Sequence, residues 1–184
     1  MPGLPGETQP ILEMARRGRK ELDKLGYTYF ITTTVVNYER VFSMEESYNY
    51  ILLESMKYLC REHSSEIIAF VYMPSHIHFI ITMNEGESIS DYLRDFKKYT
   101  SKQIKSRLLT KNKKGLYTQL QELGKYKFWM DRFDSQIILT EKILNIKINY
   151  IHYNPLKAGL VNEIDEWKFS SAYKYYTDFI SFNP

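Results

Sequence analysis

The sequence predicts an α+β sandwich, in which helices pack on one largely antiparallel sheet. Segments dense in β-branched and aromatic residues alternate with amphipathic segments along the chain. Two strand-like segments are separated only around Pro74 and Ser75, which indicates neighbouring antiparallel strands. The longest apolar run, residues 67–73, is too short to cross a bilayer. The length of 184 residues fits a single domain.

The expected order of elements is strand, helix, strand, strand, helix, strand, helix. The strands are expected at residues 27–36, 66–74 and 75–83 and within 127–139, and the helices at residues 43–63, 90–109 and 140–154. Ser43, with Glu46 completing a capping box, is expected to begin the first helix. Thr140 is expected to cap the last helix, and Pro155 to halt it.

The chain divides into residues 1–26, an N-terminal tail with a possible short basic helix, and residues 27–184, a single domain with a C-terminal extension. The first ten residues lack the charged and apolar regions of a secretory signal. Cys60 is the only cysteine and can form no internal disulfide, so we expect a reducing, cytoplasmic setting. A net charge of +3 makes only a mild case for an anionic partner.

Two histidines interrupt the apolar segment VYMPSHIHFIITM. Because side chains alternate along a strand, His76 and His78 are expected on one face, while Ile77 and Phe79 are buried on the other. Imidazoles at this spacing can share a metal ion, but two ligands are too few to hold one. Taken alone, the pair is better explained as partly exposed strand residues bonded to carboxylates or water.

Tyr150 and Asn154 lie four residues apart in the last expected helix and share one of its faces. Asn154 could provide the third metal ligand. Taken alone, however, Asn154 is better explained as a helix-ending residue before Pro155, and Tyr150 as one of 16 tyrosines that pack on the sheet. Tyr99 and Gln103 have the same spacing on the preceding helix, near the edge of its apolar face.

That preceding helix is strongly basic. Residues 92–114 contain nine lysines or arginines against one acid. A phosphate backbone fits such a stripe, whereas the alternative is a solvated helix face. The candidate DNA-binding residues are Arg94, Lys97, Lys98, Lys102 and Lys105. The candidates for stacking on unpaired bases are Tyr99, Trp129 and Phe133, although most of the aromatic residues, which make up 15% of the chain, must belong to the core.

Five motifs, taken in order, resemble the single-tyrosine HUH transposases, and in particular the REP-associated tyrosine transposases. They are MPSHIHFII, LRDFKKYTSKQI, FWMDRFDSQII, YIHYNPLKAGLV and WKFSSA, and the resemblance covers roughly residues 27–176. It implies a ferredoxin-like or RRM-like fold with the HUH motif on a central strand. It also implies that Tyr150 is the nucleophile, that His76, His78 and Asn154 bind Mg²⁺ or Mn²⁺, and that Tyr99 and Gln103 are not catalytic.

The activity implied by the resemblance is cleavage and rejoining of hairpin-containing single-stranded DNA through a 5′-phosphotyrosine intermediate. The enzyme would act as a monomer or a homodimer. Two alternatives stay open on the residues alone. One is a non-catalytic module that binds single-stranded or hairpin nucleic acid. The other is a metal-dependent phosphoesterase that uses water, although the chain contains no second HxH or HxT motif for it.

Overall fold

The computed structural model describes residues 26–174. Of the predicted tail, only Gly26 falls within this range. The elements follow one another along the chain as β1 (Thr28–Thr34), η1 (Val36–Tyr38), η2 (Val41–Ser43), α3 (Glu46–Glu62), β2 (Ser65–Tyr72), β3 (His76–Met83), α4 (Ile89–Thr110), α5 (Lys114–Gln119), β4 (Gln121–Glu122), β5 (Lys125–Tyr126), β6 (Asp134–Ile138), α6 (Glu141–Lys157) and η3 (Ile164–Glu166). No helix within residues 26–174 is long and apolar enough to span a membrane.

The main sheet has four antiparallel strands in the order β2-β3-β1-β6. The elements β1, α3, β2, β3, α4 and β6 therefore form a β-α-β-β-α-β unit, which is the ferredoxin-like arrangement. This confirms the predicted α+β fold with a largely antiparallel sheet. It also places β3, which carries both histidines of the HxH motif, in the interior of the sheet.

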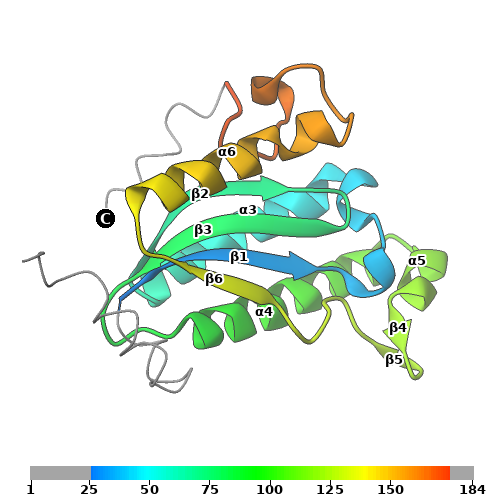
Figure 1. Ribbon diagram of the computed structural model, residues 1–184. Coiled ribbons are helices and arrows are strands. Elements are labelled where there is room, and N and C mark those ends of the chain that lie inside the picture. The colour runs from blue at the N-terminus through cyan, green and yellow to red at the C-terminus, as the bar shows by residue number, and fades with distance from the viewer. Residues whose placement is uncertain (1–25, 175–184) are drawn as a thin grey trace, which may run out of the picture.

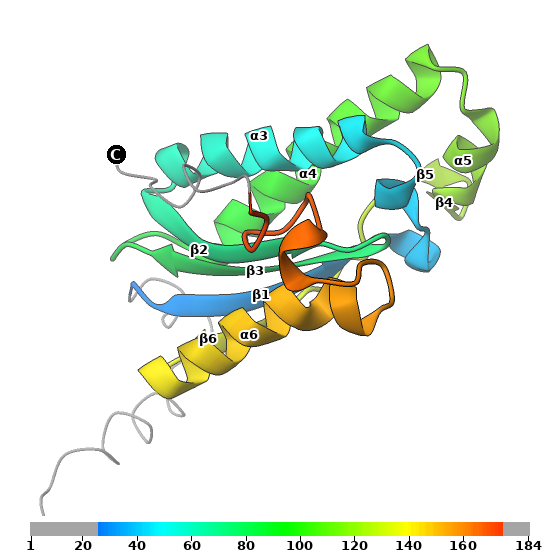
Figure 2. The same ribbon diagram turned by 90° about the horizontal axis from the view of Figure 1, so that it is seen from above.

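Helices cover both faces of this sheet (Figure 1). Seen along its edge, the sheet has α3 and α4 on one side and α6 on the other (Figure 2). Strand β3 contributes to both layers because its side chains alternate. Phe79 joins the large apolar cluster beneath α3 and α4, whereas Ile80 joins a smaller cluster that includes Ile151 of α6.

Two predicted helix boundaries were wrong. Helix α3 begins at Glu46 with Glu45 as its N-cap residue, and Ser43 instead belongs to η2, where its hydroxyl donates to the Arg40 carbonyl. The expected capping box therefore does not form. Helix α6 continues through Pro155 to Lys157, because the missing N–H of proline removes only one hydrogen bond of the last turn. Thr140 caps α6 as predicted, accepting from the Ile143 N–H.

The segment after α6 covers the outer edge of β2. The Tyr72 N–H donates to the Phe169 carbonyl at 2.8 Å, and the Ser171 N–H donates to the Phe70 carbonyl at 2.9 Å. The indole N–H of Trp167 donates to the Tyr72 carbonyl at 3.0 Å. The WKFSSA motif thus satisfies backbone groups at an edge that would otherwise be open to pairing.

Candidate active site

The two histidines of β3 lie side by side beneath α6. Their ring centroids are 4.8 Å apart. Strand β1 pairs with β3 so that Thr32 lies directly opposite His78, and the Thr32 hydroxyl is 2.8 Å from His78 Nδ1. The sequence predicted that this face presents the two imidazoles. It does, but α6 covers it, so that His78 is only 5% exposed while His76 is half-buried.

Burial keeps the imidazole of His78 neutral. Desolvation is the main cause that lowers the pKa of His78 to about 3, and the neighbouring His76 and Lys147 contribute to this shift in the same direction. When Nδ1 carries the proton and donates to Thr32, the lone pair of Nε2 is free to accept. The Nε2 atom is buried and has no hydrogen-bond partner among the described residues. Burial also lowers the pKa of His76.

Helix α6 brings Tyr150 onto the histidine pair. The ring centroids of Tyr150 and His78 are 5.3 Å apart at an interplanar angle of 73°. The Tyr150 side chain is 42% exposed, whereas the next residue, Ile151, is fully buried and fixes the rotation of the helix. Asn154 follows one helical turn after Tyr150 and is half-buried. The structure therefore brings the His78 ring between those of His76 and Tyr150, and it places Asn154 one turn along the same helix.

Three further residues of this site were not predicted. Phe30 stacks on the His78 ring at 5.6 Å and meets the Tyr150 ring edge-on at 5.8 Å. Lys147 places its Nζ 4.4 Å from the centroid of Phe30 and 6.0 Å from that of Tyr150. Phe30 and Thr32 could have been found from the register of β1 on β3, and Lys147 from its position three residues before Tyr150.

The side chains present are chemically suited to a divalent cation. The orphaned Nε2 of His78 is a neutral imidazole lone pair, the form in which histidine binds metals. No group of three or more histidine, cysteine, aspartate or glutamate side chains within residues 26–174 is arranged to hold a metal. A site built on His76 and His78 therefore needs a ligand of another kind, and the Asn154 amide oxygen is of the type that Mg²⁺ and Mn²⁺ accept.

The five predicted DNA-binding residues line one groove of about 620 Å³ between α4 and residues 126–133. Helix α4, which forms one wall of this groove, lies on the side of the sheet opposite α6 (Figure 2). Lys98 and Lys102 are exposed there. Lys97 is instead half-buried, and its ammonium donates to backbone carbonyls of Met130 and Arg132 at 2.8 and 3.2 Å. Lys97 thus ties α4 to the far wall of the groove.

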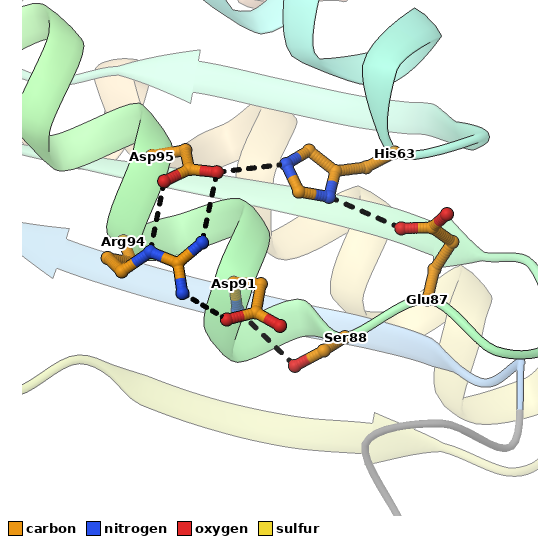
Figure 3. A network of polar contacts seen from close by, with 6 residues as sticks. All are labelled: His63, Glu87, Ser88, Asp91, Arg94 and Asp95. Carbon is orange, nitrogen blue, oxygen red and sulfur yellow. Dashed lines mark hydrogen bonds and ion pairs between the residues drawn. The ribbon is translucent and has the colours of Figure 1, made fainter.

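Arg94 is also engaged within the protein (Figure 3). Its guanidinium donates to the carboxylates of Asp91 and Asp95. Asp95 in turn lies 3.4 Å from His63 Nε2, and His63 Nδ1 lies 3.3 Å from Glu87. Hydrogen bonding to Arg94 lowers the pKa of Asp95. This network connects the end of α3 to the first turns of α4, and it neutralises part of the predicted basic stripe.

The three predicted stacking residues differ in exposure. Trp129 is buried, and its indole N–H donates to the Thr100 hydroxyl, so the prediction that it stacks on bases was wrong. The Trp129 ring instead packs in the apolar cluster under α4. Phe133 lines the groove, with Lys97 Nζ 5.6 Å above its centroid. Tyr99 is 48% exposed and lies with Gln103 in a different groove between α3 and α4, away from Tyr150.

The sheet is ferredoxin-like, and a histidine pair on an inner strand lies beneath a helix that carries a tyrosine. This is the arrangement that the resemblance to the single-tyrosine transposases implies. The sequence pattern of the IS200-like transposases matches residues 26–154, and the chain belongs to this transposase family. It is 27% identical over 156 residues to a Haemophilus influenzae protein assigned to the REP-associated tyrosine transposases, covering 85% of each chain. It is also 27% identical over 150 residues to the REP-associated tyrosine transposase of Escherichia coli (strain K12), covering 81% of this chain and 78% of the relative.

A solved structure shares both fold and sequence with this chain. It is that of a REP-associated tyrosine transposase bound to a REP hairpin, with a TM-score of 0.62 and 26% identity. The likeness covers 79% of this chain and 76% of the solved one. The family resemblance drawn from the five sequence motifs is thereby confirmed.

Proposed function

We propose that this chain is a metal-dependent transposase that cleaves and rejoins single-stranded DNA beside a hairpin, with Tyr150 as the nucleophile. One observation carries the proposal. The half-exposed Tyr150 ring lies 5.3 Å from the ring of His78, a buried neutral histidine whose Nε2 has no protein partner within residues 26–174. The proposed nucleophile therefore lies next to a neutral imidazole that is suited to bind a metal.

The chemistry is a transesterification at a DNA phosphate. The Tyr150 hydroxyl oxygen attacks the phosphorus, a bond forms between them, and the bond from phosphorus to the 3′-oxygen breaks. The phenol proton passes to water at the exposed edge of the ring, and the departing 3′-oxygen takes up a proton. The product is a 5′-phosphotyrosine ester and a free 3′-hydroxyl. Since the ester conserves the bond energy, another 3′-hydroxyl can attack it and rejoin the strands without ATP.

His76, His78 and Asn154 would hold the divalent cation, Mg²⁺ or Mn²⁺. A tyrosine hydroxyl with a reference pKa of about 10 is a weak nucleophile at neutral pH. A bound cation would supply the Lewis acidity that makes the phosphorus more electrophilic and stabilises the leaving oxygen. The Thr32 hydroxyl would orient His78 for this role by accepting from Nδ1, which would leave Nε2 to hold the cation.

Hairpin DNA is the proposed partner. Support comes from the solved relative, which is bound to a REP hairpin, and from the lysines along the α4 groove. Lys98, Lys102 and Lys105 are the residues proposed to contact phosphates, since Arg94 and Lys97 are already engaged within the protein. The chain is proposed to act as a monomer or a homodimer.

The decisive experiment compares the wild-type protein with Tyr150→Phe on single-stranded hairpin oligonucleotides in the presence of Mn²⁺. Covalent protein–DNA adducts are resolved on a denaturing gel, and DNA affinity is measured by fluorescence anisotropy. We expect no adduct from Tyr150→Phe and an affinity within about twofold of wild type, because only a hydroxyl is lost from a half-exposed side chain.

The same experiment separates the alternatives. Strand cleavage that survives in Tyr150→Phe would identify a phosphoesterase that uses water. Hairpin binding without any adduct from the wild-type protein would identify a non-catalytic binding module. An adduct trapped on Tyr150→Phe would refute the assignment of the nucleophile.

A further inference from the structure

Lys147 occupies an unusual position in the active site. It lies three residues before Tyr150 on α6, so both side chains project from the same side of the helix. Its Nζ is 4.4 Å from the centroid of Phe30 and 6.0 Å from that of Tyr150. Phe30 in turn stacks on His78. The ammonium group is therefore held beside the ring of the nucleophile and one aromatic layer away from a metal-binding histidine.

The charge of Lys147 is not matched by an acid. Within residues 26–174, no carboxylate lies within ion-pair distance of its Nζ and no hydrogen-bond acceptor contacts it. By contrast, Lys111 and Lys168 form ion pairs with Glu45 and Glu46. Among the described residues, Lys147 Nζ contacts only the aromatic faces of Phe30 and Tyr150, and none of these residues accepts a hydrogen bond from it.

An aromatic face is a weak partner for an ammonium group. A cation–π contact at a half-exposed site stabilises less than charge-assisted hydrogen bonds to phosphate oxygens. A phosphate arriving at Tyr150 would therefore draw the Lys147 donors toward it without breaking an existing ion pair. Phe30 contacts both the Lys147 ammonium group and the His78 ring.

We propose that Lys147 and Phe30 form a phosphate-binding subsite that holds a non-bridging oxygen of the DNA phosphate attacked by Tyr150. This proposal rests on the proposed function, because it names the residue that holds the substrate group at the same site. Lys147 touches the reacting phosphate and is in that sense catalytic, while Phe30 is a positioning residue.

The competing explanation is that Lys147 merely covers Phe30 with its aliphatic stem. Lys147→Met keeps that stem and removes the charge, and Lys147→Arg restores a charge with more donors. Lys142→Met is the matched control, since Lys142 is an exposed lysine in the first turn of the same helix.

The first measurement does not depend on DNA cleavage. The protein has four histidines, so selective ¹³C labelling of histidine gives a simple NMR spectrum. Inorganic phosphate is titrated in the absence of metal. We expect the His78 ring signal to shift saturably in the wild type, Lys142→Met and Lys147→Arg, and not in Lys147→Met. A His78 shift that persists in Lys147→Met would overturn the proposal.

The second measurement is the rate of adduct formation on hairpin oligonucleotides with Mn²⁺. At saturating DNA we expect Lys147→Met to slow the rate about tenfold or more, as the loss of one ionic hydrogen bond in the transition state predicts. Lys147→Arg should restore most of the rate. An equal loss in both variants, accompanied by a lower melting temperature, would assign Lys147 to packing. If the wild type forms no adduct, the proposed function fails, while the phosphate titration still decides the subsite.

Discussion

The two faces of the sheet differ in the side chains that they bury. The face beneath α3 and α4 buries a large apolar cluster that includes Phe79, Phe96 and Trp129. The face beneath α6 buries a smaller cluster together with His78, whose Nε2 is left without a hydrogen bond among the described residues. Burying a polar atom without a partner costs free energy. The larger cluster offsets this cost, so the smaller face is available for chemistry.

Strand β3 connects the two faces through simple alternation. Ile77 and Phe79 pack in the large cluster. His76 and His78 alternate with them along the strand and project to the opposite face. Because β3 is hydrogen-bonded on both sides, the histidines are held on a rigid element. The comparison predicts that changes on one face affect activity and changes on the other affect stability.

The largest effect is expected from His76→Ala combined with His78→Ala. This double variant removes both of the proposed imidazole ligands, so we expect Mn²⁺-dependent adduct formation to disappear while the far-ultraviolet circular dichroism stays close to that of the wild type. The measurement is the adduct yield on a denaturing gel with and without Mn²⁺. Unchanged activity in the double variant would eliminate the metal proposal.

The control for this variant is Phe79→Ala, on the same strand but the opposite face. Removing a fully buried phenylalanine should lower the free energy of unfolding by about 3–5 kcal/mol. Adduct yield per folded molecule should nevertheless be retained at low temperature. If Phe79→Ala abolished the chemistry of fully folded protein, the two faces would not be separable.

A second, smaller effect concerns the α4 groove. Replacing Lys98, Lys102 and Lys105 by alanine should weaken hairpin binding and lower the slope of log affinity against log salt by about 2–3, since each lost phosphate contact removes close to one unit. Anisotropy titrations across a series of salt concentrations measure both quantities.

Arg94→Ala is the matched single variant, because its guanidinium is already paired with Asp91 and Asp95. We expect it to change the salt slope much less than one of the exposed lysines does. An unaltered slope in the triple lysine variant would place the DNA on another surface.

Much of the fold was predictable because its signals are local. Alternation, apolar spacing and the Thr140 cap correctly placed β1, β2, β3, β6 and all three long helices. The start of α3 was missed because Val41 and Phe42, which precede it, are buried by tertiary packing that gives Ser43 another role. The end of α6 was missed because a proline in the last turn costs only one hydrogen bond there.

The site was predictable only in part. The spacing of His76, His78, Tyr150 and Asn154 marks them as candidates, whereas Phe30 and Thr32 enter through the pairing of β1 with β3, 46 residues apart for Thr32 and His78. Such a register is not visible in either segment alone. The same holds for the basic stripe, where charge counting could not distinguish free lysines from those engaged by the protein.

The smallest predicted effect concerns Lys97, and it tests whether this lysine is engaged within the protein. Burial lowers the pKa of its ammonium to about 8, although the Asp131 carboxylate acts in the opposite direction. The unfolded-state pKa is near 10.5, so between pH 8 and 10.5 the unfolded chain binds more protons and the free energy of unfolding rises with pH. Relative to Lys97→Met, we expect the wild type to gain about 1 kcal/mol from pH 7.5 to 9.5, allowing for solvent screening of this half-buried group.

Urea denaturation at the two pH values measures this difference. Equal changes in the wild type and Lys97→Met would contradict a folded-state pKa below that of the unfolded chain.

DNA affinity provides the complementary test at pH 7. If Lys97 holds the groove together through the Met130 and Arg132 carbonyls, Lys97→Met should lower stability while leaving the salt slope nearly unchanged, because a donor occupied by backbone carbonyls releases no counterion from DNA.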